Sequence, residues 1–357
     1  MISKELINIR LERDLQLIVN DILAALPKAP LAIVLYGGYG RGEGAWFINE
    51  AGEVSPYNDY DIDIISNERI DSSVISKLRQ NLAEKIGIKW IDLGVLSVRD
   101  LKHFKPTIQE IDFKEASRLL YGDSSIYSYI PDLNHKEIGE FDIIKLFQTR
   151  IWTFLGSWNG GFQDLGLEDS RFFQNQMAKA MLAACDLVLI KNKSYISSYK
   201  DKVKYACDLR NEEEFTSYAQ WALSEKLTPS SKLITATEMK TLFCKIYSIF
   251  VESMKYADHN IWEKFVNPDN TKSFLYYRKF QFFRNFAHVV LGHGGVIEKS
   301  VDILCAQNYV FQAWNESINT EYLKKASKIL IKWGYIESIQ MDWFKLRELV
   351  SYARIHQ

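Results

Sequence analysis

The hydrophobic pattern differs between the two parts of the chain. In the first part, short apolar runs of the strand type alternate with segments of helical periodicity. The opening segment carries charges every few residues, as an amphipathic helix does, and "PKAP" breaks that pattern before the first apolar run. The pattern predicts helices at 1–26 and 71–87 and strands at 31–38, 60–66 and 88–98. The second helix would begin at Asp71 or Ser72 as its N-cap.

Beyond "IPDLNHKEIGE" the pattern changes to long helices with aromatic residues at helical spacing, which is typical of a buried helical bundle. The predicted helices cover 140–157, 170–191, 211–225, 236–257, 274–291 and 321–353. We therefore expect an α+β protein of two domains, a small α/β domain over 1–139 and an α-helical domain over 140–357. A chain of 357 residues is also long for a single core.

Composition places the chain among ordinary globular proteins, with 47% apolar and 25% charged residues. The opening segment lacks the pattern of a signal peptide, and "AMLAACDLVLI" is interrupted by Asp186 and too short to span a bilayer. A cytoplasmic location without membrane contact is therefore expected. The four cysteines form no CxxC pair, which favours buried free thiols over a zinc site or a disulfide framework.

Charge is unevenly distributed along the chain. Residues 1–140 contain 16 of the 44 Lys and Arg residues and 22 of the 45 Asp and Glu residues. Residues 141–357 contain the other 28 basic and 23 acidic residues. An acidic half and a basic half suit a metal site that faces a phosphate-rich ligand, and ordinary surface variation explains them as well.

A glycine-rich loop, "GGYGRGEG", follows the first predicted strand. Such a loop can bring backbone N–H groups close to phosphate oxygens. A P-loop needs Gly-Lys-Ser/Thr, which is missing, and a dinucleotide-binding loop must open a helix, whereas "WFINEAGEVSPYN" predicts a hairpin. The spacing of a kinase glycine loop fails too. The loop alone therefore does not define the function.

Three aspartates alternate with apolar residues in the next strand, "NDYDID". Asp59, Asp61 and Asp63 would share one face at about 7 Å spacing, which is costly without a cation. A further acid, Asp92, stands alone in the apolar third strand. Carboxylates beside a phosphate-binding loop favour Mg²⁺, and two such ions are typical of phosphoryl or nucleotidyl transfer.

The order of these motifs resembles the DNA polymerase β-like nucleotidyltransferase superfamily. Within it, "GGYGRGEG…NDYDIDI" is most similar to the bacterial small and kanamycin-type nucleotidyltransferases. The resemblance covers roughly residues 31–97. It implies a polymerase β-like α/β domain with a short mixed sheet, followed by a helical bundle that caps the nucleotide.

The resemblance also implies roles for individual residues. Gly37 and Gly38 match the pair whose backbone meets the triphosphate, although the second position is often serine in the family. Arg41 matches an arginine found just after that pair. A helical-domain lysine often reaches the triphosphate, and Lys179 is our candidate for it. We expect Gly38→Val to abolish nucleotide binding and Gly44→Ala to be mild.

Asp59 and Asp61 match the metal-binding pair, and Asp92 matches the third carboxylate, which serves as a metal ligand and as the base for the acceptor hydroxyl. The pair Asp61 and Asp63 satisfies the same pattern, but Asn58 stands where a small polar residue usually precedes the first aspartate. About 20 residues separate Gly38 from Asp59, more than is common in the family, which implies an inserted hairpin.

The resemblance implies transfer of a nucleoside monophosphate from an NTP such as ATP to a hydroxyl, with release of pyrophosphate. A small-molecule acceptor is our first choice and a protein hydroxyl the second. Nucleic acid is the third, since the chain is not basic overall. The alternative from another class is a catalytically idle, nucleotide-sensing protein.

Overall fold

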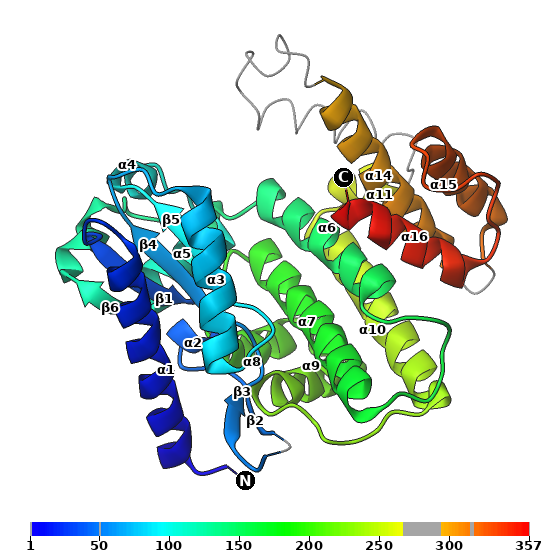
Figure 1. Ribbon diagram of the computed structural model, residues 1–357. Helices are drawn as coiled ribbons and strands as arrows, with labels where there is room; N and C mark the ends of the chain where they lie inside the picture. Colours follow the sequence, from blue (N-terminus) through cyan, green and yellow to red (C-terminus); the bar gives the residue numbers. More distant parts are fainter. Residues whose placement is uncertain (1, 50, 267–293, 315–317, 357) are drawn as a thin grey trace. The chain divides into compact units, whose positions relative to one another are not determined.

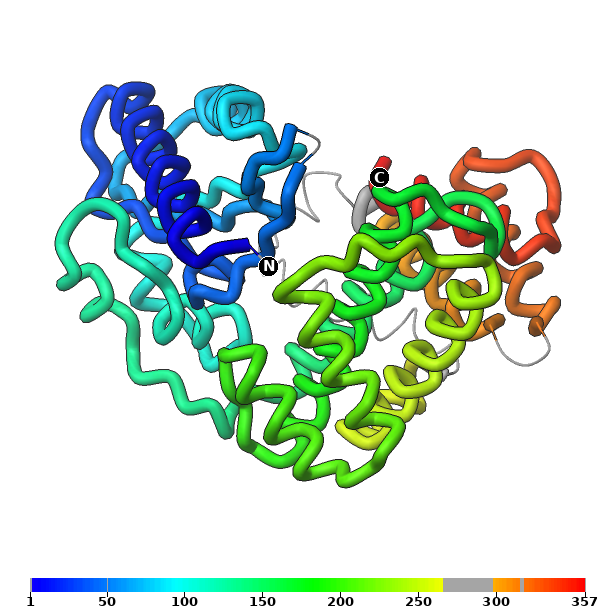
Figure 2. Tube along the Cα trace, turned by 90° about the horizontal axis from the view of Figure 1, so that it is seen from below, coloured from blue at the N-terminus to red at the C-terminus, as the bar shows by residue number. Residues whose placement is uncertain are grey.

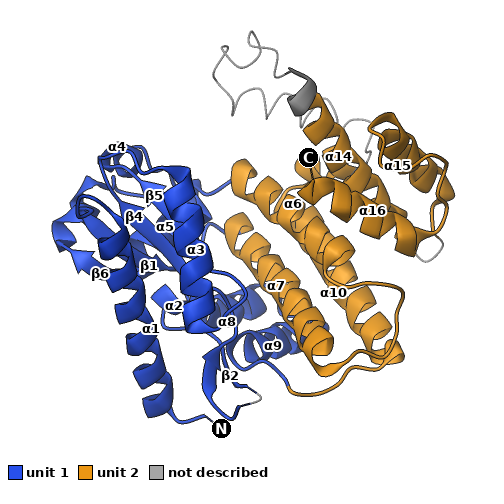
Figure 3. Ribbon diagram, viewed as in Figure 1, with its two compact units in different colours: residues 1–139, 192–230 blue, residues 140–191, 231–357 orange. Residues whose placement is uncertain are grey.

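The chain forms two compact units in the computed structural model, which describes residues 2–49, 51–266, 294–314 and 318–356. One unit contains residues 1–139 and 192–230, and the other contains 140–191 and 231–357 (Figure 3). The predicted α+β architecture, with a small mixed sheet and a helical C-terminal region, is confirmed. Residues 192–230, which the sequence analysis placed with the helical domain, group with the first unit.

A four-stranded mixed sheet forms the centre of the first unit, in the order β5-β4-β1-β6. Its strands are β1 (Ala32–Tyr36), β4 (Asp61–Ile65), β5 (Asp92–Leu96) and β6 (Arg118–Gly122). β4 and β5 are parallel, whereas β1 is antiparallel to both β4 and β6. β6 was not predicted, because none of its residues is fully buried and its sequence, "RLLYG", is short and bounded by Arg and Gly.

One face of this sheet is covered by two helices, α1 (Lys4–Ala25) and α3 (Ser72–Ile86), which lie next to each other (Figures 1 and 2). Asp71 is the N-cap of α3, where its side chain accepts a hydrogen bond from the backbone N–H of Ser73. The core on this face contains Ile33 and Leu35 of β1, Ile62 and Ile64 of β4, and Leu93 of β5. Because side chains alternate along a strand, the residues between them face the other way.

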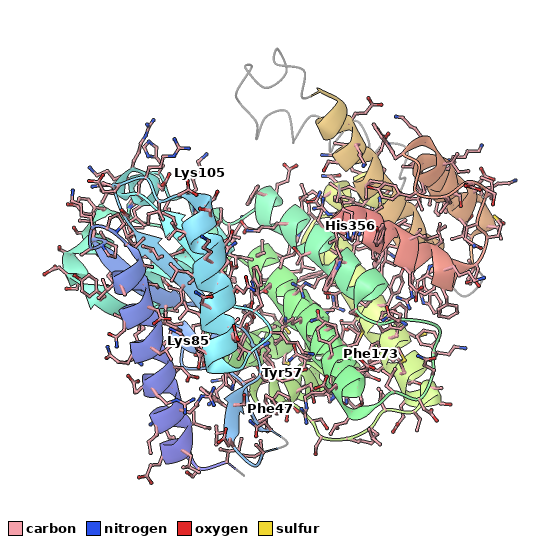
Figure 4. The ribbon with its side chains drawn as sticks, in the orientation of Figure 1. Phe47, Tyr57, Lys85, Lys105, Phe173 and His356 are labelled. Carbon is pink, nitrogen blue, oxygen red and sulfur yellow. The ribbon has the colours of Figure 1, made fainter. Side chains whose placement is uncertain are left out.

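The predicted insertion between the glycine loop and the acidic strand is a β-hairpin. It is formed by β2 (Trp46–Ile48) and β3 (Val54–Pro56), with Gly52 at a positive φ of 79° near its turn. The ring centroids of Phe47 in β2 and of Tyr57, which follows β3, are 5.9 Å apart (Figure 4).

Short helices complete the first unit. They are α2 (Gly37–Gly40), α4 (Val98–Lys102), α5 (Ile108–Ala116), α8 (Tyr199–Arg210) and α9 (Glu213–Leu227), together with the 3₁₀ turns η1 (Ser124–Tyr129) and η2 (His135–Glu137). α9 was predicted. α8 was not, because only Lys202, Val203 and Ala206 are buried, which leaves it with almost no apolar stripe.

The second unit is helical. Its described helices are α6 (Glu140–Gly156), α7 (Leu167–Lys191), α10 (Ala236–Ala257), α11 (His259–Val266), α14 (Gly294–Ala313), α15 (Thr320–Lys332) and α16 (Trp343–Ile355). The single helix predicted over 321–353 is wrong, because α15 ends before Gly334, which has a φ of 73° that a helix does not allow. The predicted helix at 274–291 lies outside the described residues. None of the described helices is long and apolar enough to cross a membrane.

A buried ion pair fastens α1 to the rest of the first unit. Arg10 Nε donates to both carboxylate oxygens of Asp14, at 2.9 and 2.7 Å, and Asp14 is 1% exposed. The same guanidinium donates to the carbonyl oxygens of Val54 and Ile86. Asp14 also accepts from the hydroxyl of buried Tyr60, which lies between Asp59 and Asp61 in the sequence. The ion pair therefore helps to hold the start of the acidic strand.

Arg10→Ala should lower the free energy of unfolding by about 3 kcal/mol or more, because it leaves the Asp14 carboxylate buried without its main partner. Urea denaturation at pH 7 measures the loss. The double variant Arg10→Met/Asp14→Leu is the control and should recover most of it, since no buried charge remains. Equal losses in the single and double variants would contradict this account.

Candidate functional site

The glycine loop starts where β1 ends, and its first residue lies against an acid of the next strand. Gly37 has a φ of 65°, which side chains other than glycine rarely adopt. A Cβ atom at this position would also overlap the Asp61 carboxylate. Both the positive φ and the contact with the Asp61 carboxylate therefore require glycine at position 37.

The other glycines of the loop differ in their surroundings. At Gly38 a Cβ has room, because its nearest neighbour is the Glu43 carbonyl oxygen at 3.7 Å. At Gly44 a Cβ would overlap the ring of Tyr39, whose hydroxyl donates to the Ala45 carbonyl oxygen at 2.7 Å. The expectation that Gly44→Ala is mild is therefore wrong, because the change must displace a buried ring. No steric reason makes Gly38 a glycine, so its predicted contact with a ligand stays a prediction.

The acids of β4 and β5 come together on the sheet face opposite α1 and α3. Asp61 and Asp92 are direct register partners in the parallel pair, so their side chains start from neighbouring positions on one face. Asp63 is paired with Gly94 in the same register, and its carboxylate lies over that glycine, where a Cβ would overlap it. Asp59 precedes the strand and is exposed. Of the three predicted strand aspartates, two are therefore on the strand.

Burial and the neighbouring carboxylates raise the pKa values of the groups in this cluster. Burial raises the pKa of Asp61 to about 7, and the charges of Asp59 and Asp92 add to that shift. Burial and the charge of Asp92 likewise raise the pKa of Asp63 to about 7. The pKa of Tyr36, at the end of β1, is raised by its burial and by the surrounding aspartates. The site thus holds more negative charge than its own residues balance.

Arg41 is held by protein groups. Its Nη1 donates to Asp112 Oδ2 at 2.9 Å, its Nε lies 3.5 Å from Glu43 Oε2, and its guanidinium lies 4.5 Å from the centroid of the Tyr199 ring. Asp112 also accepts from the Tyr195 hydroxyl at 2.8 Å. The side chain of Arg41 is 8% exposed. In this structure Arg41 joins the glycine loop to α5 and to residues 195–199, so a contact with nucleotide, predicted from the sequence, would add to these bonds.

Glu43 binds the start of α8, more than 150 residues away in the sequence. Its carboxylate accepts from the backbone N–H groups of Tyr199 and Lys200, at 2.9 and 3.4 Å, and from the Ser198 hydroxyl at 3.1 Å. A carboxylate is favourable at the N-terminus of a helix, where backbone N–H groups lack partners. The sequence analysis did not predict this contact, because no local signal links the glycine loop to α8.

Lys226 of α9 is a further residue of the site that the sequence analysis missed. It is buried, and its Nζ donates to Asn58 Oδ1 at 3.3 Å. Its positive charge lowers the pKa of Asp61, against the larger effects that raise it. In the sequence, Lys226 lies near the end of a predicted helix, in "SEKLTPS". No motif there distinguishes it from the other lysines of the chain. Lys202 of α8 is also buried, with its Nζ 5.4 Å from the centroid of the Tyr199 ring.

Lys179, the lysine predicted from the sequence, is half-buried on α7 in the second unit. The acids, the glycine loop, Arg41 and Lys226 all belong to the first unit. The structure thus brings Gly37, Asp61, Asp63 and Asp92 together, and it does not group Lys179 with them.

The donor groups that the site offers to a metal ion are the carboxylates of β4 and β5. Among the described residues, no group of three or more His, Cys, Asp or Glu side chains forms a ready-made ligand set. Mg²⁺ commonly binds one or two protein carboxylates and completes its shell with substrate phosphates and water. The neighbouring Asp61 and Asp92 fit that mode of binding. The four cysteines are free thiols, and Cys185 and Cys305 are buried.

Comparison of the chain with protein-family models, with curated proteins and with solved structures gave no match. The functional assignment therefore depends on the geometry of the site and on the motifs in the sequence.

Gly37→Ala should cost more stability than Gly42→Ala, although both glycines have a positive φ, of 65° and 72°. The shared cost of that conformation is about 1–2 kcal/mol. Only the Gly37 variant also overlaps Asp61, since a Cβ on Gly42 would meet no atom within 4 Å. In an Asp61→Ala background most of the excess cost at Gly37 should disappear, because the carboxylate is removed and a contact with the remaining Cβ at 3.3 Å is left, as a double-mutant cycle by urea denaturation would show. An excess that persists in full in that background would contradict the contact.

Asp63→Asn should stabilise the metal-free protein at pH 8 by about 2 kcal/mol or more, since an amide avoids the cost of a buried carboxylate. Because the pKa of Asp63 is raised to about 7, the folded state binds the proton more tightly than the unfolded state. The loss of folding free energy caused by the buried carboxylate therefore decreases as the pH drops from about 7, and it vanishes below about pH 4. Thermal unfolding in EDTA over this range measures it. The exposed Asp132→Asn is the control, and an Asp63 effect no larger than the control's would contradict the prediction.

Proposed function

We propose that the protein is a Mg²⁺-dependent nucleotidyltransferase that transfers a nucleoside monophosphate from an NTP to a hydroxyl acceptor and releases pyrophosphate. The observation that carries the proposal is the register of Asp61 with Asp92 on the sheet face beside Gly37. These residues belong to the motifs that resemble the polymerase β-like superfamily.

The excess negative charge of the site supports a divalent cation as part of this function. Burial is the largest cause of the raised pKa values of Asp61 and Asp63, and repulsion from the neighbouring carboxylates adds to it. Asp61 and Asp92 would hold Mg²⁺, with Asp59 able to approach from the loop before β4. When bound, Mg²⁺ would neutralise phosphate charge and favour the alkoxide form of the acceptor.

The chain's own residues would act on either side of the reacting phosphorus. The backbone at Gly37 and Gly38 would face the triphosphate. The acceptor oxygen would form a bond to the α-phosphorus, its proton would pass to the Asp92 carboxylate, and the bond to the pyrophosphate oxygen would break. Asp92 suits the acceptor side, because β5 is the edge strand of the sheet and the Asp92 side chain is 48% exposed.

Lys226 is the better supported candidate for the lysine that meets the triphosphate. It is buried, it contacts Asn58 next to Asp59, and its charge acts on Asp61. Lys179 stays a prediction from the resemblance. A small molecule remains our first choice of acceptor, and the absence of a basic surplus in the first half of the chain supports an acceptor other than nucleic acid.

The activity is tested with α-labelled ATP, CTP, GTP and UTP in Mg²⁺, with a low-molecular-mass cell extract as the source of acceptors. We expect pyrophosphate release and a labelled product with at least one NTP, and a loss of about a hundredfold or more in Asp61→Asn. The exposed Asp132→Asn is the control and should keep full activity. An Asp61→Asn variant as active as the wild type would exclude the proposal.

Two further measurements separate the alternatives. Lys226→Met should raise the KM for NTP about tenfold or more, and a larger effect of Lys179→Met would return that role to the lysine of α7. Calorimetry with a non-hydrolysable NTP tests the idle sensor. Binding that is indifferent to Mg²⁺, without any pyrophosphate release, would favour a nucleotide-sensing protein over an enzyme.

A further inference from the structure

A separate open pocket of about 570 Å³ lies beside the third carboxylate, within the first unit. One wall is the exposed side of α3, and the other is the segment that leads into β5. Arg79, Gln80 and Glu84 line the first wall, and Lys89 and Trp90 line the second. Pockets of this size commonly hold small molecules.

Trp90 gives this pocket an aromatic surface. Trp90 is 52% exposed and stands two residues before Asp92. The Arg79 guanidinium lies 5.5 Å from the centroid of the indole ring. An exposed indole beside polar groups is suited to stack on the flat face of a ring while those polar groups bind its substituents.

Arg79 connects the pocket to the proposed site. Its Nη2 donates to the Leu93 carbonyl oxygen and lies 3.7 Å from Asp92 Oδ1. The residue that lines the pocket is therefore also the one that contacts the third carboxylate. Asp92 does not line the pocket, and Arg79 is the residue that contacts both the Trp90 ring and the Asp92 carboxylate.

The charges of the lining select among ring compounds. The lining holds two cations, Lys89 and Arg79, of which Arg79 also contacts Asp92, and one anion, Glu84. A ligand rich in amino groups would face two cations here, whereas a phosphate or carboxylate group would be attracted. Gln80 can donate to and accept from hydroxyl groups.

We propose that this pocket binds the acceptor, and that the acceptor is a hydroxylated ring compound with a negative charge, such as a sugar phosphate, rather than an amine-rich one. The ring would stack on Trp90, the acidic group would lie near Lys89 and Arg79, and a hydroxyl would point to Asp92. The role as acceptor rests on the proposed nucleotidyltransferase function, whereas the binding of such a compound does not.

Binding is tested without nucleotide, by calorimetry and saturation-transfer NMR, with three probes that share one ring. They are glucose 6-phosphate, glucose and glucosamine, which differ in charge. We expect saturable binding that is strongest for glucose 6-phosphate and weakest for glucosamine. Trp90→Ala should weaken glucose 6-phosphate binding about tenfold or more. Lys89→Gln should reduce its preference over glucose while leaving glucose binding within about twofold of the wild type.

Tyr129→Ala is the matched control, because Tyr129 is another exposed aromatic residue of the first unit with a lysine, Lys102, 5.3 Å from its ring centroid. It lies outside the pocket lining and should leave binding unchanged. Failure of all three probes to bind, equal effects of Trp90→Ala and Tyr129→Ala, or a preference for glucosamine would each overturn the proposal.

The same variants keep this proposal distinct from the proposed function. In the transfer assay, Trp90→Ala should raise the KM for the acceptor and leave the affinity for NTP unchanged. If Trp90→Ala leaves transfer unchanged, the pocket is not the acceptor site, and the proposed nucleotidyltransferase function still stands. If glucose 6-phosphate binds through Trp90 but the protein never releases pyrophosphate, the proposed enzymatic function and the acceptor role are wrong. The pocket is then a binding site for ring compounds.

Discussion

The alternation of side chains along β4 is the constraint on which the first unit depends. Ile62 and Ile64 enter the core against α1 and α3, so Asp61 and Asp63 must face the other side of the sheet. A shift of one residue in register would bury both carboxylates in an apolar core, which the sheet cannot accept. The hydrophobic core therefore fixes the position of the acids. It sets Asp61 opposite Asp92 on one side and against Gly37 on the other.

Residues from distant parts of the sequence are brought to this face by a few polar contacts. Glu43 caps α8, Arg41 lies over Tyr199 and binds Asp112, and Lys226 reaches Asn58. The contacts of Glu43, of Arg41 with Tyr199 and of Lys226 reach residues 192–230 directly, and Asp112 of α5 reaches them through the Tyr195 hydroxyl. Together they give a physical reason why that segment groups with the first unit although the helices on either side of it belong to the second.

The parts of the fold that were predictable from sequence are those with a local signal. β1, β4, β5, α1 and α3 have clear periodicity, and Asp71 and Gly52 mark a cap and a turn by their residue types. The site was predictable as far as its acids and glycines lie within one short stretch and the next strand. Lys226 and the contact of Glu43 with α8 were not, because both depend on tertiary contacts across about 150 residues or more. The role of Gly44 was misjudged for the same reason, since the Tyr39 ring that fills its space is a matter of packing.

The balance of charge on the acidic face limits what can bind there. Arg41 in the glycine loop contacts Asp112 and Glu43, and its charge lowers the pKa of Asp61 less than burial and the neighbouring acids raise it. Lys226 lowers the pKa of Asp61, yet burial and the neighbouring acids still raise it to about 7. Arg79 lies 3.7 Å from Asp92, on the side of the pocket lined by Trp90. Of the β4 acids, Asp61 lies at the end of β1 where the glycine loop begins, and Asp63 lies over Gly94 of β5. A ligand that carries its own cations satisfies this face better than either a bare anion or a neutral molecule. A polyphosphate that arrives with divalent metal ions is such a ligand, and it is the substrate of the proposed nucleotidyltransferase.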